Sequence, residues 1–195
     1  AISRTAFVIV PLLAAHLTAQ ACFYRGASDP AQQPSDSSGY LLLNLPPGVA
    51  GSAQKSQLLV SRHAFQNAPI LITSLALTAD QTGQVEYGRL EISMGYTSRD
   101  ALSNRFADNP SGPMTTVIEV RDHLWTHRRW TWTDIGMQRP FLYIPAGGNL
   151  LIEVIATRRD AGDAGPPLVT AALGVGHLLS SQPYVGTPPI TGVQG

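Results

Sequence analysis

A hairpin signal between residues 134 and 160 constrains the fold more than any other part of this chain. Two runs rich in β-branched and aromatic residues, Phe141 to Ile144 and Leu150 to Ala156, are too short for ordinary helices and predict strands. Between them Pro145 cannot donate a ladder hydrogen bond, and the paired glycines that follow it accept the positive φ of a tight turn. The second run carries apolar side chains at both alternations, so we expect both faces of that strand to be covered.

The N-terminal segment has the pattern of a secretory signal peptide. Arg4 precedes an apolar run from Ala6 to Leu17, which is too short to span a bilayer and is followed by small residues that fit cleavage after Ala21. We therefore expect residues 1–21 to be a signal peptide and the protein to be secreted or held at the cell surface. Cys22 is the only cysteine and cannot form an internal disulfide, so the core must hold the fold. Lipid modification of Cys22 stays open.

Composition and charge bound the class of protein. The chain beyond residue 21 is long enough for one domain with a sizeable core and too short for two. Its 13 Lys and Arg residues balance 13 Asp and Glu residues, which gives no basic surface of the kind that nucleic acid requires. A second apolar segment, residues 168–179, is interrupted by two glycines and a histidine, so no membrane span is expected after signal removal.

The chain divides into a central domain and two flanking segments. Residues 22–39 are rich in Ser, Pro, Asp and Gln and predict a flexible linker, because they cannot bury enough surface to offset their chain entropy. Residues 180–195, rich in Pro and Gly, predict an extended or disordered tail. Between them, residues 40–179 predict about nine short strands and almost no helix, which favours an all-β, antiparallel β-sandwich or jelly roll.

The strands differ in how clearly they are marked. Alternation is cleanest from Gly88 to Thr97, where Leu90 and Ile92 fall on one face. One short helix is expected over Asp100 to Phe106, with Ser98 as its N-terminal cap. Further strands are expected at residues 40–45, 57–65, 70–78, 114–120, 129–133 and 168–175.

Three short motifs lie in the middle of the chain. They are LSNRF at residues 102–106 with Asn109 after it, RPFLY at 139–143, and GNLL at 148–151. In this combination the chain resembles a group of uncharacterised exported bacterial proteins, over about half its length, from Leu75 to Val154. The resemblance implies a secreted β-sandwich and brings no known catalytic residues. The group usually has an aspartate-proline step in the turn, where this chain has Ile144-Pro145.

The densest cluster of candidate ligand-binding residues comprises Trp125, Arg128, Arg129, Trp130 and Trp132. On a strand, Trp130 and Trp132 would project from one face roughly 7 Å apart. If that face is exposed, the indoles form a stacking platform for sugar rings and the arginines supply hydrogen bonds. If it is buried, the tryptophans belong to the core, which is the commoner environment of large aromatic side chains.

The sequence predicts no catalytic residue, metal site or cofactor. His123 and His127 would lie roughly 13 Å apart on a strand and could not share an ion, while Asp160 and Asp163 are too few for calcium. No nucleophile elbow, phosphate-binding loop or dinucleotide fingerprint occurs. A pair of carboxylates for glycoside hydrolysis stays open among Glu86, Glu91, Glu119 and Glu153.

These observations favour a secreted or cell-surface, non-enzymatic β-sandwich module that binds a carbohydrate or a protein partner. The first alternative is a self-assembling structural component of the cell envelope or extracellular matrix, in which copies associate through an exposed sheet edge or the Pro-rich ends. The second alternative is a secreted hydrolase, which would require two converging carboxylates or a nucleophile beside a histidine.

Overall fold

The computed structural model is built from antiparallel β-sheets. It describes residues 40–41, 53–65, 68–79, 82–129, 131, 133–159, 169–171, 176–180, 190–191 and 193–194. Every strand pairing in these residues is antiparallel, and they contain three short 3₁₀ turns and no α-helix. The all-β prediction is therefore confirmed. The predicted signal peptide and linker, Cys22 included, lie outside the described residues.

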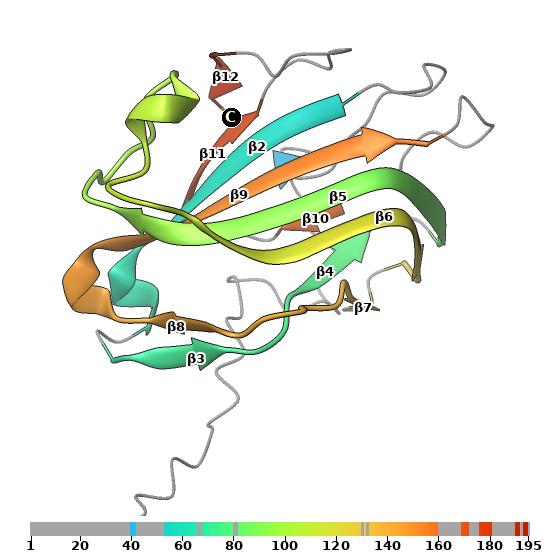
Figure 1. The fold of residues 1–195 in the computed structure, drawn as a ribbon, viewed down its shortest axis with the longest axis horizontal. Coiled ribbons are helices and arrows are strands. Elements are labelled where there is room, and N and C mark those ends of the chain that lie inside the picture. Colours follow the sequence, from blue (N-terminus) through green and yellow to red (C-terminus); the bar gives the residue numbers. More distant parts are fainter. Residues whose placement is uncertain are drawn as a thin grey trace, which may run out of the picture.

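A six-stranded sheet forms the larger part of the molecule, in the order β12-β11-β2-β9-β5-β6 (Figure 1). The predicted hairpin is wrong, because its two strands do not pair with each other. The run before the Pro145 turn becomes β8 (Phe141–Tyr143), which pairs with β3 in a separate sheet, and the run after the turn becomes β9, which lies between β2 and β5. Leu150 and Leu151 are both buried on its opposite faces, as the sequence predicted. The strands are β2 (Ala53–Val60), β5 (Gly83–Thr97), β6 (Thr115–His127), β9 (Asn149–Arg158), β11 (Gly176–Ser180) and β12 (Val193–Gln194).

Two smaller sheets lie on the lower side of the six-stranded sheet in Figure 1. One is four-stranded, in the order β1-β10-β4-β7, and the other pairs β3 with β8. The main hydrophobic core joins the large sheet to β8, because Leu90 and Ile92 belong to the same buried cluster as Phe141 and Tyr143. The strands are β1 (Tyr40–Leu41), β3 (Ile70–Ile72), β4 (Ala76–Ala79), β7 (Thr133–Asp134), β8 (Phe141–Tyr143) and β10 (Val169–Ala171).

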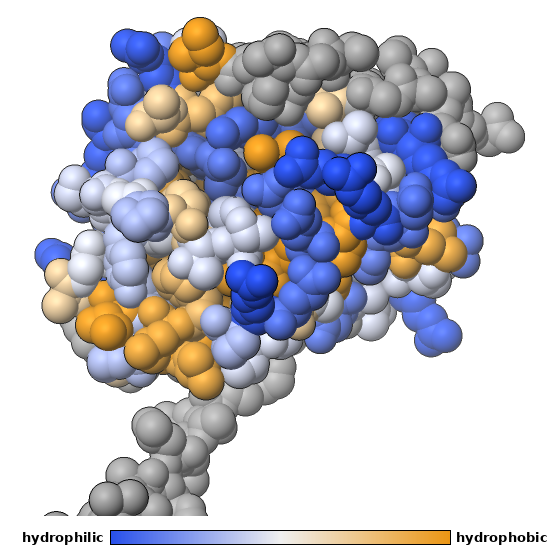
Figure 2. Space-filling model, viewed as in Figure 1, coloured by the Kyte–Doolittle hydropathy of each residue, from blue (hydrophilic) through white to orange (hydrophobic). Residues whose placement is uncertain are grey.

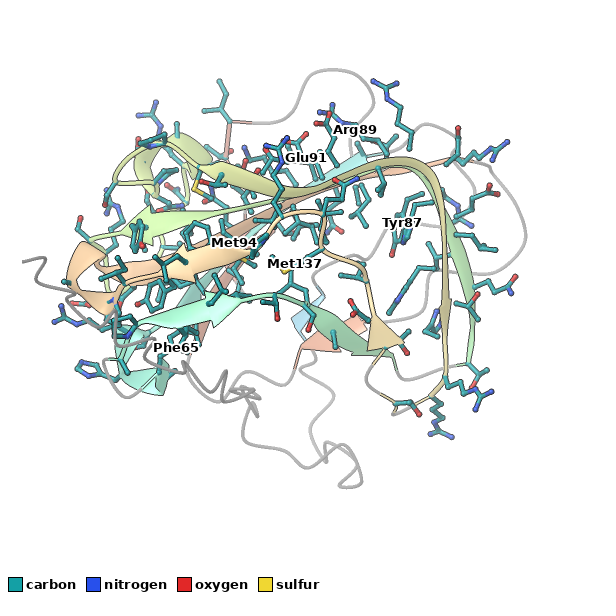
Figure 3. The ribbon with its side chains drawn as sticks, turned by 60° about the horizontal axis from the view of Figure 1, so that its bottom comes forward. Phe65, Tyr87, Arg89, Glu91, Met94 and Met137 are labelled. Atoms are coloured by element: carbon teal, nitrogen blue, oxygen red, sulfur yellow. The ribbon has the colours of Figure 1, made fainter. Side chains whose placement is uncertain are left out.

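The long β5–β6 hairpin bends sharply near Gly88 and Asp122. Asp122 has a φ of 49°, and the pairing of β5 with β9 shifts between Tyr87 and Arg89. Such irregularities bend a strand and re-aim its side chains. As a result Tyr87 and Leu90, three positions apart, are both buried. Figure 1 shows the two strands curving downward here, and Figure 3 shows Tyr87 inside the curve, with Arg89 on its outer side.

The predicted helix over residues 100–106 is wrong. The structure has an extended loop that ends in a 3₁₀ turn, η2 (Phe106–Asp108). Ser98 does not cap a helix; its N–H donates to Ser111 Oγ at 2.7 Å. The loop is held by Asn109, whose Oδ1 accepts from the N–H of Ser103 at 2.7 Å and whose Nδ2 donates to the Ser103 carbonyl at 3.1 Å. Side-chain hydrogen bonds of this kind compete with helix formation.

This loop packs on the outer face of the six-stranded sheet through a buried polar network. Gln57, fully buried on β2, accepts from Asn109 Nδ2 at 2.8 Å and donates to Glu153 Oε2 at 2.6 Å. Lys55 Nζ lies 2.9 Å from the same carboxylate oxygen and 5.3 Å from the centre of the Phe106 ring. These groups therefore anchor the loop to the sheet.

Several strand boundaries also differ from the prediction. The strand expected at 57–65 ends at Val60 and is followed by a 3₁₀ turn, η1 (Arg62–Phe65). The run 70–78 divides into β3 and β4, because the chain leaves the β3–β8 sheet after Ile72. The predicted glycine turn contains η3 (Pro145–Gly147). In the segment expected as a tail, Thr191 bridges to Arg105 and β12 pairs with β11.

Candidate functional site

The β3–β8 sheet carries an apolar surface on the side facing away from the core. Its inward residues Phe141 and Tyr143 are buried in the main cluster. Its outward residues are Leu71, Leu142 and Ile144, which are 57%, 55% and 43% exposed. We call these three residues the aliphatic patch. Figure 2 shows hydrophobic surface gathered over β3 and β8 at lower left.

The patch is a contiguous feature rather than scattered leucines. Leu71 and Leu142 are direct cross-strand partners in the antiparallel register, and Ile144 follows on the same side two residues along. Single exposed leucines are ordinary on a soluble protein, but neighbouring ones concentrate apolar surface in one place and are typical of interaction sites.

Tyr96 of β5 fixes β8 against the large sheet. Its hydroxyl accepts from the N–H of Ile144 at 3.0 Å and donates to the carbonyl of Leu142 at 3.3 Å. Its ring stacks on Tyr143, with centroids 5.7 Å apart, and packs against Phe141 at 6.0 Å. The backbone beneath the patch is therefore held by specific contacts rather than by strand pairing alone.

The turn after β8 requires both of its glycines. Gly148 has a φ of 117°, and a Cβ there would lie 2.5 Å from the Thr97 carbonyl oxygen. At Gly147 a Cβ would lie 2.8 Å from the Tyr96 ring. The Tyr143 hydroxyl donates to the Gly148 carbonyl at 2.7 Å. Burial, reinforced by Tyr96 and opposed by Arg62, raises the pKa of Tyr143 to about 12.

Two arginines lie near the ends of β8, and one carboxylate, Asp100, lies near Arg62, because both residues hydrogen-bond to Asn149. Arg62 lies in η1 beside the Tyr143 end of β8, and Arg139 precedes the opposite end of that strand; both are exposed. The stretches 61–79 and 136–149, which contain β3, β8 and their flanks, have no Asp or Glu. An apolar surface between two arginines is therefore matched to a segment that combines aliphatic and acidic side chains.

The structure describes three of the five sequence-predicted ligand residues. Trp125 is 2% exposed and stacks on His127 with centroids 4.7 Å apart, so its indole belongs to the core, the alternative that the sequence left open. Arg128 and Arg129 are exposed just after β6. Trp130 and Trp132 lie outside the described residues.

A group of buried polar atoms lies inside the bend of the β5–β6 hairpin. Tyr87 Oη, His123 Nε2 and Trp125 Nε1 are buried without a hydrogen-bond partner in the structure as described. Tyr87 and His123 are cross-strand partners. Burial raises the pKa of the Tyr87 hydroxyl. The described residues contain no group of three or more His, Cys, Asp or Glu side chains placed to hold a metal ion.

The glutamates considered for hydrolysis are engaged mainly with cations. Glu153 pairs with Lys55, Glu91 with Arg89, and Glu86 with Arg159. Glu119 is exposed on β6 opposite Glu91. These contacts are typical of ion pairs on a sheet surface.

Sequence reasoning missed the aliphatic patch, although one signal pointed toward it. Leu71 and Leu142 are each the middle residue of a three-residue apolar run next to a proline, Pro69 or Pro140. Alternation over three residues is too brief to show which side chains face solvent.

Within the described part of the chain, no helix is long and apolar enough to cross a membrane. Comparison of the chain with protein-family models, with curated proteins and with solved structures finds no match in any of the three.

Proposed function

We propose that this protein is a secreted or cell-surface, non-enzymatic module that docks a protein partner on the aliphatic patch of the β3–β8 sheet. The observation that carries the proposal is the exposed cross-strand pair Leu71 and Leu142, extended by Ile144. Covering these side chains removes apolar surface from water and favours association.

The same proposal includes a β-sandwich architecture, in which the six-stranded sheet forms one layer and the smaller sheets form the other. The shared buried cluster of Leu90, Ile92, Phe141 and Tyr143 supports it, because side chains from two facing sheets interdigitate in a sandwich core. The patch then lies on the outer face of the smaller layer, where a partner can reach it.

The charges favour an acidic partner segment. Arg62 acts electrostatically on Tyr143 at one end of β8, and Arg139 lies two residues before Phe141 at the other end. Complementary charges at the rim of an interface steer encounter and fix orientation. The partner that fits is an extended polypeptide segment with aliphatic side chains in its middle and carboxylates at its ends.

Another copy of this chain fits the patch less well. In a two-fold symmetric dimer the same surface occupies both sides of the interface. That arrangement would bring Arg62 and Arg139 of both copies onto one interface with no acidic side chain from 61–79 or 136–149 to balance them. Self-assembly through this face is therefore disfavoured relative to a different, acidic partner.

The patch also suits protein better than carbohydrate. Sugar rings stack on aromatic faces, whereas the patch is aliphatic and Trp125 is buried. Carbohydrate binding by Trp130 and Trp132 remains a prediction from the sequence, with Arg128 and Arg129 as exposed neighbours.

The test uses a fluorescent extended peptide in which valine alternates with threonine and both ends carry glutamate. Fluorescence anisotropy measures its binding to the full chain and to Leu142→Asp. We expect the substitution to weaken binding by about tenfold or more, because it places a carboxylate in the apolar contact. Leu124→Asp is the matched control, since Leu124 is 54% exposed on β6, away from the patch.

Each outcome decides the proposal. Equal binding by the wild type and Leu142→Asp contradicts it, as does equal loss in Leu124→Asp. Replacing the glutamates of the peptide by lysines should weaken binding several-fold, because exposed ion pairs contribute roughly 0.2–1 kcal/mol each. A glycan-array signal that survives Leu142→Asp, with no peptide binding, would favour the carbohydrate alternative.

A further inference from the structure

The hydrogen bonds of Tyr96 determine which edge of the β3–β8 sheet is open. The Tyr96 hydroxyl contacts the Leu142 carbonyl and the Ile144 N–H, so the backbone polar groups of these two residues point away from β3. In an antiparallel pair, residues alternate between those that exchange hydrogen bonds across the ladder and those that do not. The Leu71–Leu142 pair is therefore one without ladder hydrogen bonds.

It follows that the N–H and C=O of Leu71 point outward, away from β8. The sheet contains only β3 and β8, and among the described residues no hydrogen bond to the Leu71 backbone occurs at that edge. The edge of β8 is occupied by Tyr96, whereas the N–H and C=O of Leu71 at the edge of β3 face no other described strand. Figure 1 shows β3 at the lower border of the described strands, beyond β8.

We propose that the edge of β3 takes an extended segment of the partner as an added antiparallel strand, hydrogen-bonded to the N–H and C=O of Leu71. This inference rests on the proposed function and specifies how the partner binds. Strand addition obtains affinity from main-chain hydrogen bonds and specificity from alternate side chains. The partner residue opposite Leu71 places its side chain on the outward face, where it extends the aliphatic patch.

The length of the edge limits what can bind. Only the three residues Ile70–Ile72 form β3, and Pro69 immediately before them cannot donate a hydrogen bond. Short edges and prolines restrict open-ended strand association. The edge therefore suits one short segment of a defined partner rather than a continuing stack of copies.

The first test changes only the backbone of the peptide probe described above. N-methylation at the residues that face Leu71 removes the N–H that would bond to its carbonyl, whereas N-methylation at the intervening residues leaves that N–H intact. We expect the first set to weaken binding by about tenfold or more and the second set to change it less than about threefold. Equal tolerance of both sets overturns strand addition.

The second test changes the protein. Leu71→Pro removes the N–H that points outward from the edge of β3. Edge strands tolerate proline at such positions, because the missing donor is not part of the ladder. Leu71→Ala controls for the lost side chain. We expect Leu71→Pro to weaken peptide binding by about fivefold or more beyond Leu71→Ala. Equal effects of the two substitutions contradict the inference. If Leu71→Pro fails to fold, the methylated peptides on the wild type decide.

The two proposals fail in different ways. If the peptide binds Leu142→Asp as tightly as the wild type, docking on the patch is contradicted altogether. Binding that depends on Leu142 but tolerates N-methylation in both sets retains the docking surface and removes the added strand. A peptide-independent dimer that disappears in Leu142→Asp, measured by size-exclusion chromatography, would replace the acidic partner by a second copy.

Discussion

At the scale of single residues, two buried tyrosines should respond in opposite directions to loss of the hydroxyl. Tyr143→Phe removes a bond to the Gly148 carbonyl and should lower the free energy of unfolding by about 1 kcal/mol. Tyr87→Phe removes a buried hydroxyl without a hydrogen-bond partner in the described structure and should raise it by about 1 kcal/mol. Urea denaturation measures the free energy of unfolding of both variants. An equal loss of stability in the two would contradict the prediction.

Tyr143 also makes the free energy of unfolding depend on pH. An unfolded tyrosine loses its proton near pH 10, whereas folded Tyr143 keeps it up to about pH 12. The unfolded state then binds fewer protons, so the free energy of unfolding falls between those pH values, while the contribution is fully present below pH 10. Tyr143→Phe should flatten the alkaline part of a stability-against-pH curve. An unchanged slope would argue against the raised pKa.

Gly148 should tolerate substitution far less well than another loop glycine. Gly148→Ala combines a φ of 117° with a Cβ 2.5 Å from the Thr97 carbonyl oxygen, and the strained φ alone costs about 1–3 kcal/mol. Gly112→Ala is the control, because a Cβ there meets nothing within 4 Å. Thermal unfolding should show a large drop in Tm for the first and almost none for the second; equal shifts would contradict the account.

At the scale of elements, Asn109 should control the loop between β5 and β6. Asn109→Ala removes the bonds to Gln57 and Ser103, so the loop should open more often and trypsin should cut faster after Arg99 or Arg105. Asn104→Ala, at an exposed position in the same loop, is the control. Equal cleavage rates in the two variants would mean that the network does not anchor the loop.

Elements with a long two-residue alternation were predictable from sequence, and those shaped by local polar contacts were not. The periodicity around Leu90 and the two-sided coverage of β9 came directly from residue order. The wrong helix at 100–106 has a physical cause, because Asn109 supplies hydrogen bonds that compete with the helix. Sequence also could not place Trp125, since the bend at Asp122 resets which side chains of β6 face inward.

At the scale of the whole molecule, the all-β class followed from composition and strand spacing, but the candidate site did not. A patch made by Leu71 and Leu142 requires the pairing of two three-residue strands that lie far apart in the sequence. Neither strand alone distinguishes an outward leucine from a buried one. The open edge of β3 depends in addition on Tyr96, which comes from a third strand.

We propose the outer face of the β3–β8 sheet and the edge of β3 as the binding surface. Amide hydrogen exchange of the full chain, with and without the valine–threonine peptide, tests it most directly. With the peptide bound, the amides of residues 70–73 and 141–144 should exchange more slowly, with little change elsewhere. Protection confined to residues 123–133, or none at saturating peptide, would contradict it.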